Sequence, residues 1–530
     1  QGYLPLLLAT DPQNPDWKGQ EATGFADNWN AGLSFYHNVF AREHNQFVDS
    51  FRKQAAEHPG DDSGLRDPSN PSTKILNTDV TPDVLFEVAR LVVSAEIAKI
   101  HTIEWTTQLL YDESLYRGMN SNWSGLLRKG DQISQLLTSV VDRLRTSNSA
   151  VASNQWYAIL ASGPGITGSG NKMNTAHPEQ WSIANDADVN GGTNHFGSPF
   201  NFPEEFVTVY RLHALVPDLF EYRELQKPDA IALKIPVVES FRGRATSLVH
   251  DRGLANWALT MGRQRLAALS LNNSPLFLQN LQMDRLQTTS KRLDVVALDI
   301  IRDREHGVPR FNEFRRQYGL RQLTSFDDFI DAHPTVSGDD RRAQEKLVVR
   351  LREVYGQHKC DDNKVITHAQ VDVGGKPITD CLGHTNGTMV DNVEDLDTVV
   401  GWLAESTRPH GFAISETQFF VFILNASRRL YSDRFLTSSF RPEIYTTLGY
   451  NWVNDNGPKK MIESLASNGH IGDPVSPMKR VLLRTIPELK DELDHVVNAF
   501  DPWARDRGTY YTLEWKPRKG AEGDDAFKKP

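Results

Sequence analysis

Residues 203–217 read PEEFVTVYRLHALVP, and this stretch carries the first indication of the fold. Its Pro-Glu-Glu start suits the first turn of a helix, where proline loses no hydrogen bond and acidic side chains complement the helix dipole. Pro217 ends the run, because proline cannot continue a helix. Phe206, Tyr210 and His213 recur at helical spacing. The pattern therefore predicts a helix with an aromatic ring, a phenol and an imidazole on one stripe.

The phenol and the imidazole of this stripe suggest a specific chemistry. A tyrosine one turn from a histidine suits a tyrosyl radical beside a haem, with His213 binding the iron and Tyr210 near the edge of the macrocycle. A core histidine with satisfied hydrogen bonds, next to a packed tyrosine, explains the same spacing. On spacing alone this simpler interpretation is favoured.

Most other long segments also have helical patterns. Apolar residues recur at helical spacing along 33–51, and Thr81, Pro82 and Asp83 form a helix start before a long apolar segment. A further helix is predicted over 414–430, which reads ISETQFFVFILNASRRL. Because strand patterns are scarce, we expect a mainly α protein.

We interpret residues 1–530 as a single domain with two long surface insertions. The first, 145–202, is rich in Gly, Ser and Asn, and the second, 356–392, is polar and contains both cysteines. Cys360 and Cys381 could close a short disulfide, which would suit an exported protein, or remain two free thiols. The sequence favours neither the disulfide nor the free thiols, and it does not indicate where the protein is located.

The composition excludes several classes of function. The chain has 530 residues with 58 basic and 68 acidic side chains, a net charge of −10, so we expect no nucleic-acid partner. No run of 18 apolar residues occurs, so no transmembrane segment is expected. Two cysteines are too few for an iron–sulfur cluster or a Cys-rich zinc module.

Six blocks, in order along the chain, resemble the fatty-acid α-dioxygenases of the peroxidase–cyclooxygenase superfamily. The blocks are FAREHNQ (40–46), ARLVVSAEIAKIHTIEWT (89–106), YRLHALVPD (210–218), DVVALDIIRDREHGVPRFNEFR (294–315), GFAISETQFFVFILNASRRLYSDRF (411–435) and YNWVN (450–454). The resemblance covers nearly the whole chain, from about residue 24 to 503. It implies a haem peroxidase/cyclooxygenase-like helical domain that adds O2 to C2 of a fatty acid, giving a 2-hydroperoxy acid.

The resemblance also assigns roles around the haem. His213 matches the proximal ligand of the haem iron, and Tyr210 matches the radical tyrosine that abstracts a hydrogen from C2. Arg302 resembles the arginine that pairs with a haem propionate. Asp299 falls where a partner of the proximal histidine is expected, and a carboxylate there would push electron density toward the iron. The expected cofactor is non-covalent haem b.

Three further residues match the group that holds the substrate carboxylate: His101, Thr106 and Arg429. A carboxylate brought into an apolar channel needs a paired charge, and the planar fork of arginine supplies one. Holding that end of the fatty acid would place C2 against the radical. One spacing is awkward, because residues five apart lie about 140° apart on an α-helix. His101 and Thr106 can therefore contact one carboxylate only if it sits between them or the helix distorts.

The sequence departs from the family before the REHN block. Only about forty residues precede Arg42, and none resembles the segment that carries the family's distal histidine and calcium loop. We expect that this segment is a separate N-terminal chain, that it was left out of this sequence, or that oxygenase chemistry was lost. Calcium is expected only where that segment is supplied. Two alternative functions remain: a haem peroxidase of small reductants, and a non-catalytic haem-fold protein that binds lipid.

Overall fold

The computed structural model describes residues 2–8, 17–23, 29–106, 204–266, 268–282, 290–331, 336, 338–372, 375–406, 413–437, 439–455, 477–494, 496, 498–500 and 503. These residues fall into two compact units. The first is drawn from Gln1–Phe200, Leu219–Arg265 and Ser427–Pro530, and the second from Asn201–Asp218 and Leu266–Ala426. The predicted insertion at 145–202 lies outside the described residues, and the single-domain interpretation stays a prediction. Within the described ranges, no helix is long and apolar enough to cross a membrane.

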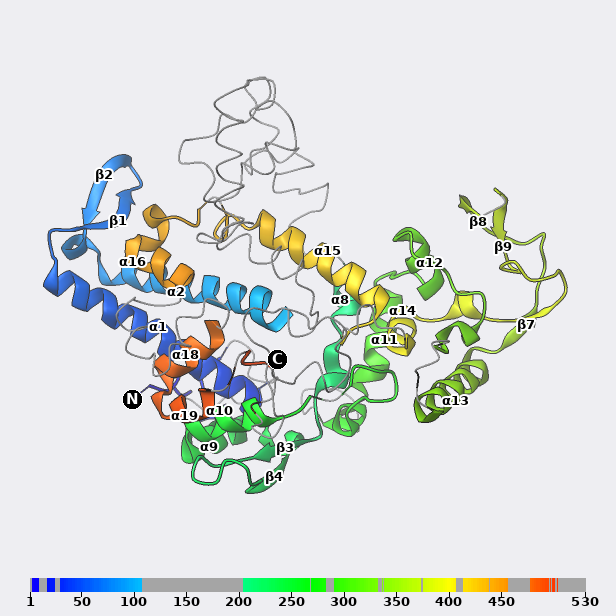
Figure 1. Cartoon of the computed structure of the whole chain (residues 1–530), viewed down its shortest axis with the longest axis horizontal. Helices are drawn as coiled ribbons and strands as arrows, with labels where there is room; N and C mark the ends of the chain where they lie inside the picture. Colours follow the sequence, from blue (N-terminus) through cyan, green and yellow to red (C-terminus); the bar gives the residue numbers. More distant parts are fainter. Residues whose placement is uncertain are drawn as a thin grey trace, which may run out of the picture. The chain divides into compact units, whose positions relative to one another are not determined.

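Two long helices form the centre of the first unit, and both confirm the sequence patterns (Figure 1). Helix α1 (Ala31–Glu57) begins where the Asn30 side chain accepts a hydrogen bond from the Leu33 amide, 3.0 Å away. Helix α2 (Pro82–Ile100) begins at the predicted cap, since the Thr81 side chain accepts from the Val84 amide. Both helices contribute one face to a common apolar core.

Helix α16 (Pro442–Asp455) completes this core and packs against the hairpin of β1 (Asp62–Asp67) and β2 (Asn70–Leu76), as Figure 1 shows. Its Trp452 and Val453 are fully buried. Gly449 allows the close approach of α16 to α2, because a Cβ there would lie 2.8 Å from Cγ2 of Val92. The YNWVN block is thus explained by packing.

The charged block REHN is also explained by a buried contact in the first unit. Glu43 on α1 and Glu96 on α2 both pair with Arg484, and all three side chains are at most 1% exposed. Glu43 further accepts from the indole nitrogen of Trp452 at 2.8 Å. Burial and the neighbouring Glu43 raise the pKa of Glu96 well above its ordinary value, against the opposing charge of Arg484.

Short elements make up the rest of the described first unit. They are η3 (Asn77–Asp79), η4 (His101–Trp105), β3 (Leu219–Tyr222) paired with β4 (Leu233–Pro236), η7 (Val237–Ser240), α9 (Gly243–Arg252), α10 (Leu254–Arg263), α18 (Pro477–Thr485), η12 (Pro487–Leu489) and α19 (Lys490–Leu493).

The second unit is built around α11 (Val295–Glu305) and α12 (Phe311–Gln317), which lie in one of the blocks quoted above. The Asp294 side chain caps α11 by accepting from the Ala297 amide at 3.0 Å. Gly307 follows the helix with φ +72°, a left-handed conformation that suits glycine after a helix end. The turn carries the chain into α12, whose Phe311 is fully buried.

The remaining elements of the described second unit surround these two helices. They are α8 (Glu204–Val209), η6 (Leu212–Leu215), η8 (Leu276–Asn280), β5 (Leu281–Gln282) paired with β6 (Arg292–Leu293), η9 (Phe326–Phe329), α13 (Gly338–Tyr355), β7 (Gln357–Lys359) paired with β10 (Met389–Asp391), β8 (Val365–Val371) paired with β9 (Pro377–Thr379), η10 (Val393–Asp395) and α14 (Thr398–Ala404). Helix α15 (Glu416–Ser432) confirms the predicted helix over 414–430 and passes from the second unit into the first after Ala426.

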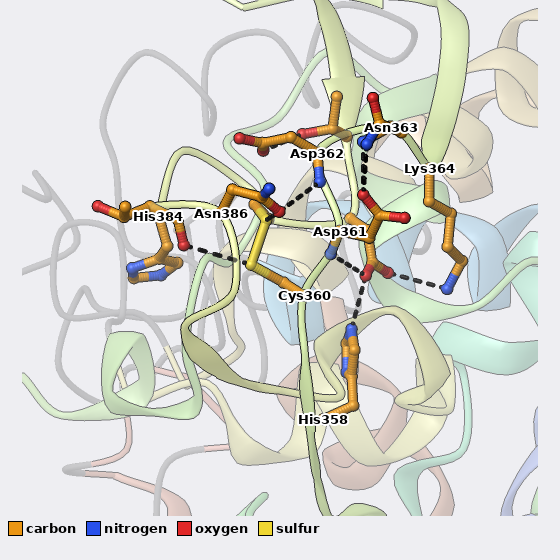
Figure 2. The surroundings of a disulfide bond; sticks show 12 residues. His358, Cys360, Asp361, Asp362, Asn363, Lys364, His384 and Asn386 are labelled. Carbon is orange, nitrogen blue, oxygen red and sulfur yellow. Dashed lines mark hydrogen bonds and ion pairs between the residues drawn. A yellow bond between two sulfur atoms is a disulfide. The ribbon is translucent and has the colours of Figure 1, made fainter.

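The polar segment 356–392 contains a disulfide between Cys360 and Cys381, whose Cα atoms are 5.0 Å apart (Figure 2). This decides between the two states that the sequence left open. Both cysteines are at most 3% exposed. Beside the disulfide, the Asp362 amide donates to Oδ1 of Asn386 at 3.1 Å. The described part of the segment is therefore covalently closed within the second unit.

The predicted continuous helix over 203–217 is wrong. Helix α8 ends at Val209, and the chain turns through Tyr210 and Arg211 into the 3-10 turn η6. The Tyr210 amide is shared between the carbonyls of Phe206 and Val207, both at 3.1 Å, as is common where a helix ends. Arg211 then leaves the helical region with φ −73° and ψ 67°.

Candidate functional site

His213 lies on η6 and bonds to an acid of α11. Its Nδ1 is 2.9 Å from Oδ2 of Asp299, whose side chain is 9% exposed. Because the carboxylate can only accept, Nδ1 carries the hydrogen, and Nε2 is the nitrogen left to bind another group. The His213 side chain is 39% exposed, so this nitrogen belongs to an accessible imidazole. The arrangement is that of a histidine oriented to bind a metal through Nε2.

Arg211 shares the same acid. Its Nη1 is 3.2 Å from Oδ1 of Asp299, while Nη2 is 3.9 Å from Oδ1 of Asp303 on the same helix. The Thr208 hydroxyl donates to the other oxygen of Asp303. Burial raises the pKa of Asp303, against the hydrogen bond from Thr208 and the charge of Arg211. A compact set of charges therefore surrounds the back of the imidazole.

Tyr210 lies between aromatic rings. Its ring stacks on Phe206 with 5.2 Å between centroids and on Phe422 of α15 with 5.8 Å. Its exposed fraction is 37%, and burial of the rest raises the pKa of the phenol to about 12. The phenol is therefore protonated at neutral pH. The structure keeps Phe206 and Tyr210 together, as predicted, but places His213 on the following turn rather than on the same helix.

Asp397 holds the C-terminal end of α11. It accepts from Nε and Nη2 of Arg304 at 2.8 and 2.7 Å, from Arg310, and from the Tyr355 hydroxyl at 2.9 Å. Burial would raise the pKa of Asp397, but these partners hold it below its ordinary value. Arg302, the predicted propionate partner, is exposed on the same helix. The helix that carries Asp299 is thus fixed at its end by a charged clamp.

The three predicted carboxylate-binding residues belong to the first unit. His101 begins a π-helical turn, η4, that directly follows α2. Both the amide and the hydroxyl of Thr106 donate to the carbonyl of His101, the hydroxyl at 2.7 Å. An i→i+5 hydrogen bond widens the turn beyond the 3.6 residues of an α-helix, so the two side chains lie closer to one face than they would on an α-helix. The helix is therefore distorted between the two predicted residues, which is one of the two arrangements that a shared carboxylate would need.

Glu104 fixes this turn in place. Its carboxylate accepts from the amides of Met478 and Ala499, both at 2.8 Å. The hydroxyl of Thr102 donates back to the carbonyl of Ala98 at 2.9 Å, a bond that competes with regular helix geometry. The glutamate of the HTIEWT segment was missed as a site-forming residue.

His101 and Arg429 differ in charge. Burial lowers the pKa of His101 to about 4, so its imidazole is neutral at pH 7, and its ring lies 4.7 Å from that of Trp105. Arg429 is 8% exposed near the end of α15. If Thr106 is to donate to a carboxylate, its hydroxyl hydrogen has to leave the carbonyl of His101.

A family model described as animal haem peroxidase matches residues 1–157, 173–366 and 386–473. The chain belongs to the animal haem peroxidase family. Haem is therefore the cofactor class that the family implies. The family model does not match residues 367–385, which lie inside the segment that contains the disulfide.

Several curated relatives of the chain are α-dioxygenases. The chain is 30% identical over 496 residues to Alpha-dioxygenase PIOX of Nicotiana tabacum, which covers 92% of this chain and 57% of the relative. It is 31% identical to Alpha-dioxygenase PIOX of Pisum sativum, again covering 57% of that protein. The chain thus spans a little over half of the length of these relatives.

Solved structures of α-dioxygenases are also similar. The fatty acid α-dioxygenase of Oryza sativa matches with a TM-score of 0.57 and 26% identity, over 95% of this chain and 63% of that one. A tyrosine-to-phenylalanine variant of the rice enzyme with palmitic acid matches with a TM-score of 0.58 and 27% identity. The mainly α peroxidase–cyclooxygenase fold expected from the sequence is confirmed.

The residues of the second unit fit a haem. His213 offers Nε2 because Asp299 engages Nδ1 at 2.9 Å, and the imidazole is accessible. Arg302 is an exposed guanidinium on α11 and can pair with a propionate. Arg211, which sequence reasoning left without a role, stands in the Tyr-Arg-x-His motif itself. The feature that could have indicated a role for Arg211 is its position between Tyr210 and His213, which the resemblance had already assigned to the haem site.

Proposed function

We propose that this chain supports α-dioxygenation of fatty acids, in which O2 is added at C2 through a radical on Tyr210. The proposal is carried by one observation, the His213–Asp299 hydrogen bond of 2.9 Å directly after Tyr210. Similarity to plant α-dioxygenases over 92% of the chain supports it. The cofactor is non-covalent haem b, held by Nε2 of His213 and by Arg302 at a propionate.

The proposed reaction takes place at the phenol of Tyr210. A bound haem, once oxidised by a peroxide, would supply the one-electron oxidation that turns this phenol into a phenoxyl radical. With a pKa raised to about 12, the phenol keeps its proton until then. The radical takes a hydrogen atom from C2 of the fatty acid, and O2 adds to the carbon. Transfer of a hydrogen atom from the Tyr210 phenol to the resulting peroxyl radical gives the 2-hydroperoxy acid and regenerates the Tyr210 phenoxyl radical.

The carboxylate end of the substrate is assigned to His101, Thr106 and Arg429. Arg429 supplies the positive charge, since burial keeps His101 neutral. A neutral imidazole and a hydroxyl can each donate one hydrogen bond to a carboxylate. The π-helical turn brings Thr106 closer to the face of His101 than an α-helix would, which supports their joint role.

The first experiment is an absorption spectrum of the purified chain, before and after addition of haem. A Soret band that shifts with cyanide is expected from haem on His213 with an accessible opposite face. Oxygen uptake with palmitate is then compared between the wild type and Tyr210→Phe. We expect the variant to keep its Soret band, because His213 is unchanged. Its oxygen uptake should fall by at least about 100-fold, because it lacks the phenol that forms the radical. Full activity of the variant would refute the radical assignment.

Arg429→Leu separates the proposal from a peroxidase of small reductants. An α-dioxygenase needs the guanidinium to hold the carboxylate, so palmitate-dependent uptake should fall, while oxidation of a neutral phenol by peroxide should not. Fatty-acid binding with no oxygen uptake in the wild type would favour the non-catalytic alternative. The separate chain carrying a distal histidine, and the calcium that would accompany it, stay predictions.

A further inference from the structure

We propose that Arg211 is a positioning residue that limits electron donation from His213 to the haem iron by sharing the carboxylate of Asp299. This inference rests on the proposed haem site at His213. It adds a third member to the histidine–aspartate pair, and it assigns a role to the arginine between the radical tyrosine and the iron ligand.

The geometry divides the two oxygens of Asp299 between two donors. Oδ2 accepts from Nδ1 of His213 at 2.9 Å, and Oδ1 pairs with Nη1 of Arg211 at 3.2 Å. Arg211 therefore does not displace the histidine. It acts on the histidine only through the charge and basicity of the carboxylate that both contact.

Burial makes this charge effective. The side chains of Asp299, Asp303 and Arg211 are 9%, 7% and 20% exposed, so solvent screens them little. Arg211 is held from a second side by Asp303, which itself accepts from Thr208. The guanidinium is thus anchored where it neutralises the acid behind the iron ligand.

The sign of the effect follows from charge. A lone carboxylate draws the Nδ1 proton, gives the imidazole anionic character and favours ferric iron. A guanidinium on the same carboxylate weakens that pull. It also places a positive charge near the metal, which favours the ferrous form. Both effects raise the Fe(III)/Fe(II) potential relative to a histidine–aspartate pair without the arginine.

The test uses the full chain loaded with haem and compares wild type, Arg211→Gln and Arg211→Lys. Midpoint potentials are measured by spectroelectrochemistry, and the Fe(II)–His stretch by resonance Raman. We expect R211Q, which keeps donors but loses the charge, to shift the potential lower and the stretch to higher frequency. R211K should stay near the wild type, because it keeps the charge.

Two further variants make the result decisive. Arg321→Leu removes an 80% exposed charge from the same unit and should shift neither quantity. Asp299→Asn should shift both in the direction opposite to R211Q, and it serves as the test where R211Q does not fold. Equal shifts in R211Q and R211K, or none in R211Q with an intact Soret band, would overturn the inference alone. Absence of a Soret band in the wild type would overturn the proposed function as well, and appears before any potential is measured.

Discussion

His101 is neutral at physiological pH because burial lowers its pKa to about 4 from an ordinary 6.5. Its folded-state pKa is below its unfolded value, so the unfolded chain binds the extra proton between these pH values. The stabilisation by neutral His101 is therefore complete above pH 6.5 and is lost as the pH falls toward 4. A shift of this size corresponds to at most about 3 kcal/mol.

The measurement is the free energy of unfolding from pH 7.5 to 4 in wild type and His101→Gln. We expect the difference between the two curves to narrow as the pH falls, because glutamine does not titrate. His58→Gln, at a histidine whose side chain is 62% exposed, is the matched control and should follow the wild type. Parallel curves for wild type and H101Q would contradict a buried neutral imidazole.

At the level of single residues, the sequence predicts some members of the candidate site and misses others. The resemblance pointed to Asp299 as the partner of His213, and the two side chains bond at 2.9 Å. It offered nothing for Arg211, because that role depends on two acids of α11, 88 and 92 positions along the chain from it. The approach of a side chain to distant acids is a tertiary property that local spacing does not contain.

Among the helices, α12 and α14 meet at a contact that depends on a glycine. A Cβ on Gly401 would lie 2.2 Å from Cγ of Phe311, a fully buried ring. Gly401→Ala therefore forces apart two helices of the second unit. We expect the free energy of unfolding to fall by about 1–2 kcal/mol, since the overpacking exceeds the gain in helix propensity.

Denaturant unfolding of G401A checks this, with Gly338→Ala as the control. Gly338 begins α13, and a Cβ there meets only the flexible end of Arg342, at 3.4 Å. G338A should match or slightly exceed the wild type. A stability gain in G401A would show that α14 is not packed as closely on Phe311 as described.

The helices themselves were predictable to different degrees. The predicted helix start at Thr81 and the predicted helix over 414–430 are both confirmed. Helix caps and apolar periodicity are local features, so the sequence alone shows them. The helix predicted over 203–217 breaks after Val209 although its pattern continues. In this turn the backbone leaves the helical conformation, and Arg211 forms ion pairs with Asp299 and Asp303 of α11. Tertiary packing determines which of the two conformations is more stable, and the periodicity of the sequence does not show it. The π-helical turn was not predicted, because the spacing of His101 and Thr106 left open whether the helix distorts or the carboxylate sits between them.

The second unit connects its disulfide to the candidate site through a series of contacts. Cys360 follows β7, which pairs with β10, and β10 leads through η10 to Asp397. Asp397 in turn clamps Arg304 at the end of α11, the helix that carries Asp299. The described part of segment 356–392 is therefore connected through these contacts to the helix that carries the partner of the proposed iron ligand.

Removal of the disulfide should accordingly act on both the insertion and α11. The bond links residues 21 positions apart, and closing a loop of this size stabilises a protein by about 3 kcal/mol. In a Cys360→Ser, Cys381→Ser double variant we expect a loss of this order in the free energy of unfolding. Hydrogen exchange should become faster first in 357–391 and then in α11, because the clamp at Asp397 loses its support. The wild type with reductant should behave like the variant, whereas uptake of two alkyl groups by the unreduced wild type, detected by intact mass, would show that its thiols are free.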